Sequence, residues 1–154
     1  MTMLHKIDEI DNWVLEIIKD DPVRPELSAD FRIGKNSEMF ALWDEQTLGA
    51  VCCVYYTEGI PGSIEEMKTM SSEFADTVVF YTIWSYERGS GRTLINQASS
   101  YIKDAYMGIK NVVTLSPKTE MAEKFHLKNG AWRYRENHET INYAYELNES
   151  LDRK

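Results

Sequence analysis

The feature that most limits the fold is an apolar run that leads into a pair of glycines. Residues 77–84 read Thr-Val-Val-Phe-Tyr-Thr-Ile-Trp, a β-branched and aromatic run typical of a central strand covered on both faces. Gly89 and Gly91 follow within a short turn, and apolar residues then recur at helical spacing over 94–105. A strand, a glycine-rich turn and a helix in this order predict an α/β domain.

The turn itself predicts a phosphate-binding site. A helix N-terminus presents free backbone N–H groups and the positive end of the helix dipole, and glycines let the backbone approach an anion closely. Polar and basic side chains flank the glycines: Arg88, Ser90, Arg92 and Thr93. The motif has neither the third glycine of a dinucleotide fingerprint nor the lysine of a P-loop. Taken alone, it also fits a plain strand-to-helix turn.

The rest of the chain shows no repeat, low-complexity stretch or linker, so residues 1–154 are predicted to form a single domain. The expected order is helix, strand hairpin, short helix, strand, helix, strand, helix and strand hairpin. The ranges are 7–19, 39–43 with 47–57, a short helix from 63, 77–84, 94–105, 111–115, 119–128, and 132–134 with 140–147. Ser63 and Thr119 are expected to cap their helices, and Asn129-Gly130 to end the last helix.

Composition and charge exclude several classes of function. The formal net charge of −8 argues against a nucleic-acid partner, which needs a basic face. No run approaches the roughly 20 apolar residues that span a bilayer, and the start lacks a secretory signal. Cys52 and Cys53 are expected to be small core residues, because adjacent cysteines rarely bridge. These features predict a soluble cytoplasmic protein without a membrane partner.

The succession of elements resembles the GCN5-related N-acetyltransferase (GNAT) superfamily. The resemblance implies an α/β (α+β) domain with a mixed, mostly antiparallel twisted sheet, a splayed parallel strand pair and flanking helices. In that family the turn binds the coenzyme A (CoA) pyrophosphate, and the splayed strands admit the pantetheine arm. A CoA thioester, acetyl-CoA or malonyl-CoA, is therefore the implied substrate. The implied binding residues are Ile83, Trp84, Ser85, Arg88, Gly89, Ser90, Gly91, Arg92, Thr93 and Phe125.

Two further segments resemble malonyl-CoA decarboxylase, whose catalytic domain has a GNAT fold. They are Thr-Leu-Ser-Pro at 114–117 and Phe-His-Leu-Lys-Asn-Gly-Ala at 125–131. The family's catalytic serine and histidine map onto Ser116 and His126. Loss of CO₂ from malonyl-CoA leaves a thioester enolate, whose oxygen needs hydrogen-bond donors.

One expected donor to that oxygen is a backbone N–H at a β-bulge near residues 83–85, and Ser116 is expected either to be a second donor or to orient the substrate carboxylate. His126, expected to titrate near neutrality, is the implied general acid that protonates the enolate carbon. This hypothesis requires Ser116 and His126 within hydrogen-bond reach, flanking the gap between strands 77–84 and 111–115.

Two other functions stay open. An N-acetyltransferase would polarise the acetyl-CoA carbonyl with the same strand, while an amine acceptor attacks and His126 protonates sulfur. A non-catalytic CoA-binding module would keep only the turn. No metal is predicted, because His138 and Glu139 lack metal-site spacing with His126.

The remaining candidate residues have structural alternatives. Arg24, between two prolines, is interpreted either as a surface arginine or as a partner for a substrate carboxylate. Aromatic residues alternate along the final hairpin and are expected to pack in the core or in an interface: Trp132, Tyr134, Tyr143 and Tyr145. A homodimer through this hairpin is expected by analogy with the fold class.

Overall fold

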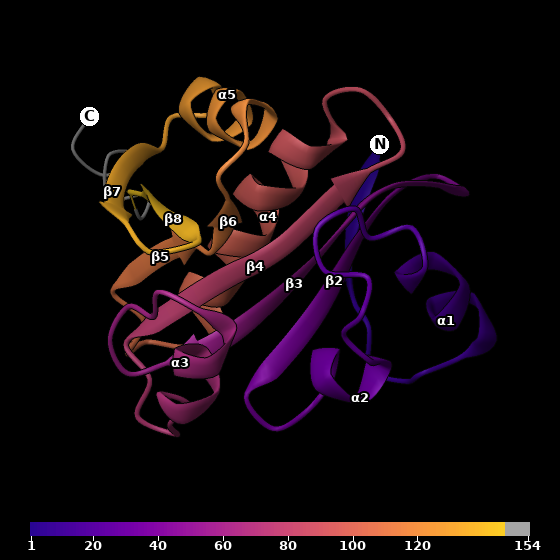
Figure 1. Ribbon diagram of the computed structural model, residues 1–154. Coiled ribbons are helices and arrows are strands. Elements are labelled where there is room, and N and C mark those ends of the chain that lie inside the picture. The colour runs from indigo at the N-terminus through magenta and orange to yellow at the C-terminus, as the bar shows by residue number, and fades with distance from the viewer. Residues whose placement is uncertain (147–154) are drawn as a thin grey trace.

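One mixed β-sheet organises residues 1–146, the part of the chain that the computed structural model describes (Figure 1). Its strands lie in the order β1-β2-β3-β4-β5-β8-β6, and β7 pairs with β8. Their bounds are β1 Thr2–Lys6, β2 Ser37–Asp44, β3 Thr47–Thr57, β4 Thr77–Ser85, β5 Asn111–Thr114, β6 Ser116–Pro117, β7 Trp132–Glu136 and β8 Thr140–Tyr145. β4 and β5 run parallel, whereas the other described pairs are antiparallel. The predicted mixed, mostly antiparallel sheet is confirmed.

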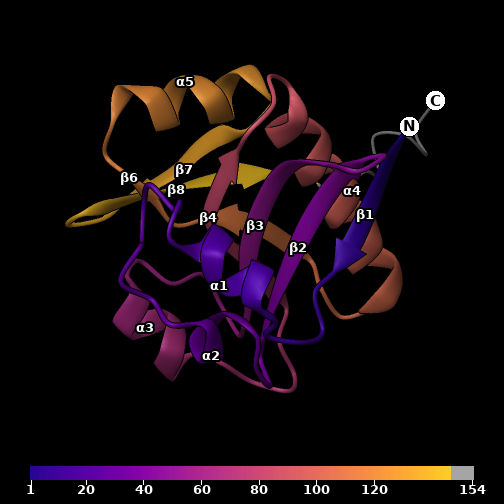
Figure 2. The same cartoon turned by 90° about the vertical axis from the view of Figure 1, so that its right-hand side faces the viewer.

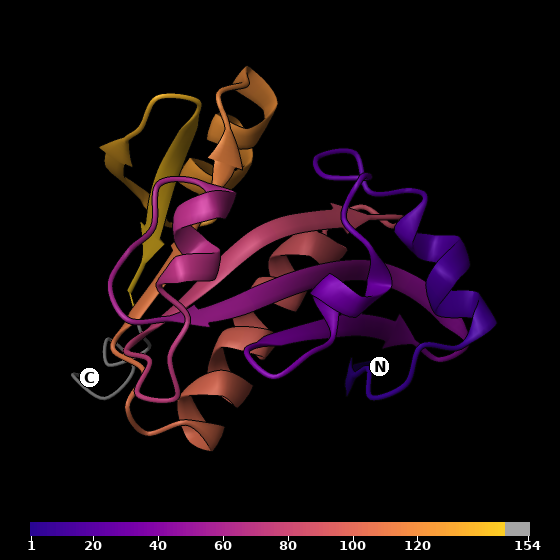
Figure 3. The ribbon, with the colours of Figure 1, turned by 60° about the horizontal axis from the view of Figure 1, so that its bottom comes forward.

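Helices cover both faces of the sheet. They are α1 Asn12–Ile18, α2 Ala29–Arg32, α3 Ile64–Thr69, α4 Ser90–Ala105 and α5 Glu120–Lys128. Figure 2 shows α1, α2 and α3 on one face and α4 on the other, in agreement with the side chains that each contributes to the two cores. α5 and the β7–β8 hairpin stand together at one end of the molecule (Figure 3). No helix of residues 1–146 is long and apolar enough to cross a membrane.

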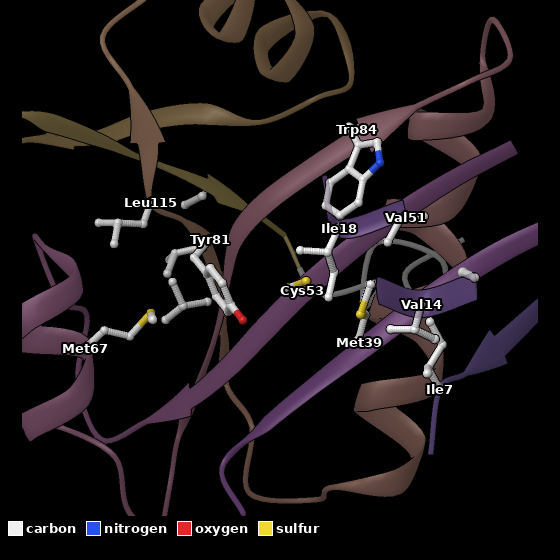
Figure 4. Close-up of a cluster of buried hydrophobic side chains, with 14 residues drawn as sticks. Ile7, Val14, Ile18, Met39, Val51, Cys53, Met67, Tyr81, Trp84 and Leu115 are labelled. Atoms are coloured by element: carbon white, nitrogen blue, oxygen red, sulfur yellow. The ribbon is translucent and has the colours of Figure 1, made fainter. Parts of the chain in front are cut away.

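The two cores follow from the alternation of side chains along the central strands. One core lies under α1 and α3, and Figure 4 shows Cys53, Met67 and Tyr81 within it. The other lies under α4 and contains Cys52. Adjacent residues of a strand point to opposite faces, so the two buried, free cysteines pack in different cores. Their prediction as core residues is confirmed.

Local signals placed most elements correctly. Ser63 Oγ accepts from Glu66 N at 3.1 Å and Thr119 Oγ1 from Ala122 N at 3.2 Å, so both expected caps form. Gly130 adopts a φ of 99° after α5, a left-handed conformation that suits glycine. Strand β3 has the predicted bounds. The expected final strand reached Leu147, which lies outside the described residues, and the expected dimer stays a prediction.

The N-terminal region differs from the prediction. Helix α1 begins only at Asn12, after Asp11 as N-cap, and the first residues form the edge strand β1 instead. Ile7 follows β1 and is buried, and its N–H donates to Met39 O at 2.9 Å. Its apolar side chain fitted the helical spacing in the sequence, and for that reason the helix was predicted to begin too early. The short elements α2 and β6 were also missed.

Strands β4 and β5 separate halfway along β4. Parallel pairing runs from Thr77 with Asn111 to Phe80 with Thr114, and β4 continues alone to Ser85 on this side. The chain after β5 turns away, because β6 pairs with β8. The splayed parallel pair that the resemblance implied is therefore present.

A β-bulge in β4 lies where the strands separate. Thr82 faces Cys53 on β3 and Phe80 faces Val54, which leaves Tyr81 as the extra residue. The expected bulge at 83–85 was placed too late in the strand, and that expectation is wrong. The bulge falls in the run that reads as uninterrupted β structure, so no turn residue marked it.

Candidate active site

The glycine-rich turn anchors the N-terminus of α4 to strand β3. Gly89 is the N-cap residue, with a φ of 85° and open space where a Cβ would point. The N–H groups of Tyr86 and Glu87 both donate to Gly49 O, at 2.7 and 3.2 Å. No side chain caps the helix, and within residues 1–146 the Gly91 and Arg92 N–H groups have no acceptor outside it. Two first-turn amides thus remain available to an anion.

The side chains around this turn suit a phosphate group. Arg88 and Arg92 are exposed, and neither forms an ion pair within the described part of the chain. A Cβ added to Gly91 would lie 3.1 Å from Phe125 Cζ and 4.0 Å from Ser85 Cβ. Because Gly91 has no side chain, Phe125 of α5 and the end of β4 pack directly against the turn. The structure therefore brings these predicted CoA-binding residues together.

The other predicted residues lie in and beside the same turn. Ser90 and Thr93 are half-buried in the first turn of α4, where Ser90 N donates to Glu87 O at 3.1 Å. Ile83 is half-buried and Trp84 is buried on β4, and the Trp84 indole N–H donates to Tyr86 Oη at 3.0 Å. Trp84 thus belongs largely to the core, and β4 offers mainly its backbone to a ligand.

His126 lies on α5 in a pocket of aromatic rings. Its side chain is buried, and its Nδ1 lies 2.7 Å from Tyr145 Oη on β8. The imidazole stacks on the ring of Tyr143 with centroids 5.1 Å apart and meets Phe125 edge-on. Burial lowers the pKa of His126 to about 4, because the imidazolium would lose its hydration. The expectation that His126 titrates near neutrality is therefore wrong, and the ring is neutral at pH 7.

Ser116 is buried at the junction of β5, β6 and β8. Its Oγ donates to Thr114 Oγ1 at 2.8 Å, and the same Thr114 oxygen accepts from Tyr143 N at 3.0 Å. Among residues 1–146 no hydrogen bond joins Ser116 to His126, because Ser116 Oγ donates to Thr114 and His126 Nδ1 lies against Tyr145. The serine–histidine pair that the decarboxylase hypothesis required is therefore absent, and any decarboxylation has to depend on His126 without Ser116 as its direct partner. Tyr143 separates them: its ring contacts His126, and its backbone shares the threonine hydroxyl with Ser116.

Two residues beside His126 were not among the predicted site residues. Burial raises the pKa of Tyr145, and the amide of Asn129 beside its hydroxyl opposes this rise. Asn129 Nδ2 is buried and has no hydrogen-bond partner among residues 1–146. The sequence analysis expected Tyr145 only to pack in the core or in an interface. The signal that could have indicated its contact with His126 is the alternation along β8, which puts Tyr143 and Tyr145 on the same face of the strand.

Arg24 bridges the two separating strands. Its Nε donates to Tyr81 O of β4, and its Nη2 donates to Leu115 O after β5, both at 3.0 Å. The side chain is half-buried, and desolvation lowers the pKa of its guanidinium. The interpretation of Arg24 as a surface arginine is therefore wrong.

A buried ion pair holds the segment that carries Arg24. Arg32 has no exposed side-chain surface, donates to Asp21 Oδ2 at 2.8 Å and also donates to Arg24 O at 2.8 Å. Asp21 Oδ1 accepts from Arg24 N at 3.0 Å and from Thr82 Oγ1 of β4 at 2.7 Å. Desolvation would raise the pKa of Asp21, but these hydrogen bonds together lower it. No sequence pattern indicated this network, because Thr82 lies 61 residues from Asp21 along the chain.

Two surface hollows differ in how they relate to these residues: one of about 240 Å³ between β5 and the β7–β8 hairpin is lined in part by Tyr145, and the other lies away from the site. This other hollow, of about 540 Å³, lies along β1 and is lined by Met3, Leu4, His5, Trp13, Trp43 and Glu45. None of the predicted site residues lines it, so the chemistry of the side chains, rather than hollow size, identifies the candidate site. Among residues 1–146, no three His, Cys, Asp or Glu side chains are grouped as metal ligands.

Comparisons with known proteins define the fold. No protein-family model matches the chain. No curated protein matches its sequence. The structure resembles a malonyl-CoA decarboxylase from Agrobacterium vitis with a TM-score of 0.77 and 20% identity, over 95% of this chain and 60% of that chain. The loading GNATL domain of CurA from Lyngbya majuscula matches with a TM-score of 0.69 and 14% identity, over 96% of this chain and 98% of that chain.

A Bacillus subtilis acetyltransferase in complex with CoA gives a TM-score of 0.65 and 13% identity, over 96% of this chain and 99% of that chain. The chain therefore has the GNAT-type fold that its sequence resembled. It spans about 60% of the length of the Agrobacterium decarboxylase. At these identities the similarity extends to the fold, and the roles of the site residues depend on the local chemistry described above.

Proposed function

We propose that this protein is an acyl-CoA enzyme that decarboxylates a malonyl thioester through proton transfer from His126. In this proposal residues 1–154 form one catalytic domain, and the turn at 88–93 binds the CoA pyrophosphate. The buried free cysteines suit the reducing cytoplasm, where we place the protein. A single observation carries the proposal: His126 is buried and neutral, with Nδ1 next to the Tyr145 hydroxyl.

The tautomer of the imidazole depends on this contact. The Tyr145 hydroxyl can both donate and accept, and in this proposal its O–H donates to His126 Nδ1. A ring that accepts at Nδ1 carries its proton on Nε2. His126 therefore offers a neutral N–H donor to a substrate, as other enzymes do when a neutral imidazole polarises a carbonyl.

The strength of this acid favours carbon over sulfur as the proton acceptor. A departing thiolate, with a pKa of about 8.5, is too weak a base to take a proton from a neutral imidazole. A thioester enolate is a much stronger base at carbon. Neutral His126 can thus protonate an enolate, whereas acyl transfer would need the imidazolium, which burial disfavours.

The proposed step is balanced in atoms and charge. The bond between the α-carbon and the carboxylate breaks, CO₂ leaves, and the electron pair forms the enolate. The α-carbon then takes the Nε2 proton of His126, while Nδ1 takes the hydroxyl proton of Tyr145. Nε2 afterwards takes a proton from solvent and Nδ1 returns its proton to Tyr145, which restores both groups. The net reaction converts malonyl-CoA and one proton into acetyl-CoA and CO₂. Ser116 supports the site through Thr114, and β4 supplies backbone donors to the enolate oxygen.

The structural similarity supports the same reaction class. The Agrobacterium vitis protein, with a TM-score of 0.77, is named as a malonyl-CoA decarboxylase. The Bacillus subtilis structure, an acetyltransferase with bound CoA, supports CoA as ligand and keeps amine acetylation as the alternative. A module that binds CoA without turnover is the third hypothesis.

An assay by mass spectrometry separates the three hypotheses. Purified protein is incubated with malonyl-CoA or with acetyl-CoA, each with and without a mixed pool of amines. We expect acetyl-CoA from malonyl-CoA without any amine, and no change in acetyl-CoA. Free CoA released from acetyl-CoA only with amines would instead establish a transferase. If neither thioester changes, a thermal-shift measurement with CoA tests binding alone.

A further inference from the structure

The gap between β4 and β5 contains a positive charge that takes part in no ion pair among residues 1–146. Arg24 enters this gap and donates to one carbonyl on each strand, Tyr81 O and Leu115 O. Carbonyl groups accept hydrogen bonds but carry no net charge. Within residues 1–146, Arg24 forms no ion pair, and its Nη1 has no hydrogen-bond partner. A guanidinium has five N–H donors, so most of its donor capacity is unused.

Two carboxylates lie near Arg24, the exposed Glu26 and the buried Asp21, and neither forms an ion pair with it among residues 1–146. Asp21 gives one oxygen to Arg32 and the other to Thr82 and to the backbone N–H of Arg24. That arrangement fixes the Arg24 backbone without neutralising its side chain. Arg32 adds a second restraint, since it donates to the Arg24 carbonyl at 2.8 Å. The fold therefore holds a half-buried cation in place, at a cost in desolvation, next to the point where the strands part.

The position of this cation defines what it can bind. The glycine-rich turn begins α4 on one face of the sheet, whereas α1, α2 and the loop between them, which carries Arg24, lie on the opposite face (Figure 2). A CoA thioester whose pyrophosphate lies on the turn, and whose arm enters between the strands, brings its acyl end toward Arg24. An acyl group that ends in a carboxylate would find unused N–H donors there. An ammonium group would be repelled.

We propose that Arg24 is a specificity residue that binds the free carboxylate of a dicarboxylic acyl-CoA, such as a malonyl thioester. The inference rests on the proposed function for the location of the acyl chain, and it adds the residue that selects the substrate. Arg24 acts in binding and does not transfer protons. Because decarboxylation destroys the carboxylate that Arg24 holds, its contact belongs mainly to the ground state, so its loss should raise KM rather than lower kcat.

The test uses two stable CoA thioethers that differ only in charge. S-(2-carboxyethyl)-CoA carries a terminal carboxylate, and S-(2-carbamoylethyl)-CoA carries the neutral amide of the same shape. Binding of each is measured by calorimetry to the wild type, Arg24→Gln, Arg24→Lys and Lys19→Gln. Lys19 is an exposed cation at the end of α1, so its variant controls for the loss of one positive charge.

We expect Arg24→Gln to weaken the carboxylate probe about 10-fold to 100-fold and to leave the amide probe unchanged. Arg24→Lys should restore part of the preference, and Lys19→Gln should change neither probe. Equal weakening of both probes by Arg24→Gln would show that Arg24 only ties the strands together, and no weakening of either would also overturn the proposal. Since neither probe can react, the result is independent of whether the enzyme decarboxylates malonyl-CoA.

Discussion

Two buried polar clusters lie on either side of the separating strands, and they differ in how completely their groups are satisfied. In the cluster of Asp21 and Arg32, both carboxylate oxygens and all three guanidinium nitrogens have partners. The cluster of His126, Tyr145 and Asn129 is neutral and leaves donors over. A complete network contributes to the stability of the fold, whereas an incomplete one retains groups for chemistry at a cost in stability. We therefore propose a structural role for the first cluster and a catalytic role for the second.

The largest effect that we expect from a substitution in either cluster is a loss of turnover when His126 is replaced. His126→Gln keeps a buried polar side chain but removes the N–H that the enolate needs, so turnover should fall by ~10²-fold to 10⁴-fold. Initial rates with malonyl-CoA measure this loss. His138→Gln, at an exposed position, is the matched control and should keep the wild-type rate. A His126→Gln enzyme of normal rate would remove His126 from the mechanism.

The opposite effect is expected in the first cluster. Asp21→Asn leaves the fully buried Arg32 without its counter-ion, and the free energy of unfolding should fall by about 3–5 kcal/mol. Urea unfolding gives this value. Asp20→Asn removes the neighbouring carboxylate, which only accepts from the exposed Tyr86 hydroxyl, and should cost less than about 1 kcal/mol. Equal losses in both variants would contradict the structural role of the buried pair.

The neutral cluster should also govern stability in acid. The pKa of His126 is about 4 in the folded chain against 6.5 for an ordinary histidine, so below pH 6.5 the unfolded state binds a proton that the folded state does not. Above pH 6.5, His126 therefore has no effect on the free energy of unfolding. As the pH falls from 6.5 to 4, it lowers that free energy by about 3 kcal/mol. His126→Gln should remove this part of the acid limb. An unchanged difference between pH 7 and pH 4.5 would mean that His126 is not buried as a neutral ring.

The smallest expected effect separates two tyrosines that share one face of β8. Tyr145→Phe removes the hydroxyl that holds His126 Nδ1, and kcat should fall about tenfold with little change in KM. Tyr143→Phe is the control, because no hydrogen bond joins the Tyr143 hydroxyl to His126 among the described residues, and its polar neighbour is Arg133. If the two variants behave alike, the contact at 2.7 Å only packs the imidazole and does not position it.

The two clusters also differ in how far the sequence revealed them. His126 and Ser116 lie in short motifs that resemble a known family, and the glycine-rich turn shows its chemistry within a few residues. The contacts among Asp21, Arg32 and Thr82 join the segment around α1 and α2 to strand β4. They therefore depend on how that segment packs against the sheet. No local pattern encodes that packing. Arg24 could be named as a carboxylate partner, but only the fold shows that it lies between two strands.

The same contrast holds for the elements of the fold. Caps and turns were predicted correctly at Ser63, Thr119 and Gly130, because a single side chain or dihedral decides them. Strand β1 was missed because it is an edge strand with mostly exposed side chains, so it lacks an apolar pattern. The bulge at Tyr81 depends on the register with β3, which a single strand does not carry.

The central claim is that His126 donates its proton as a neutral imidazole, and the pH dependence of kcat/KM for malonyl-CoA tests it most directly. This ratio reports ionisations of the free enzyme and substrate. Acetyl-CoA formation is followed from pH 5 to pH 9, with His126→Gln providing the background at each pH. We expect a rate that stays level from pH 6 to pH 8, because the ring is already neutral throughout that range. A rate that falls as the pH rises through 6 to 7 would show that the imidazolium is the acid, and would contradict the claim.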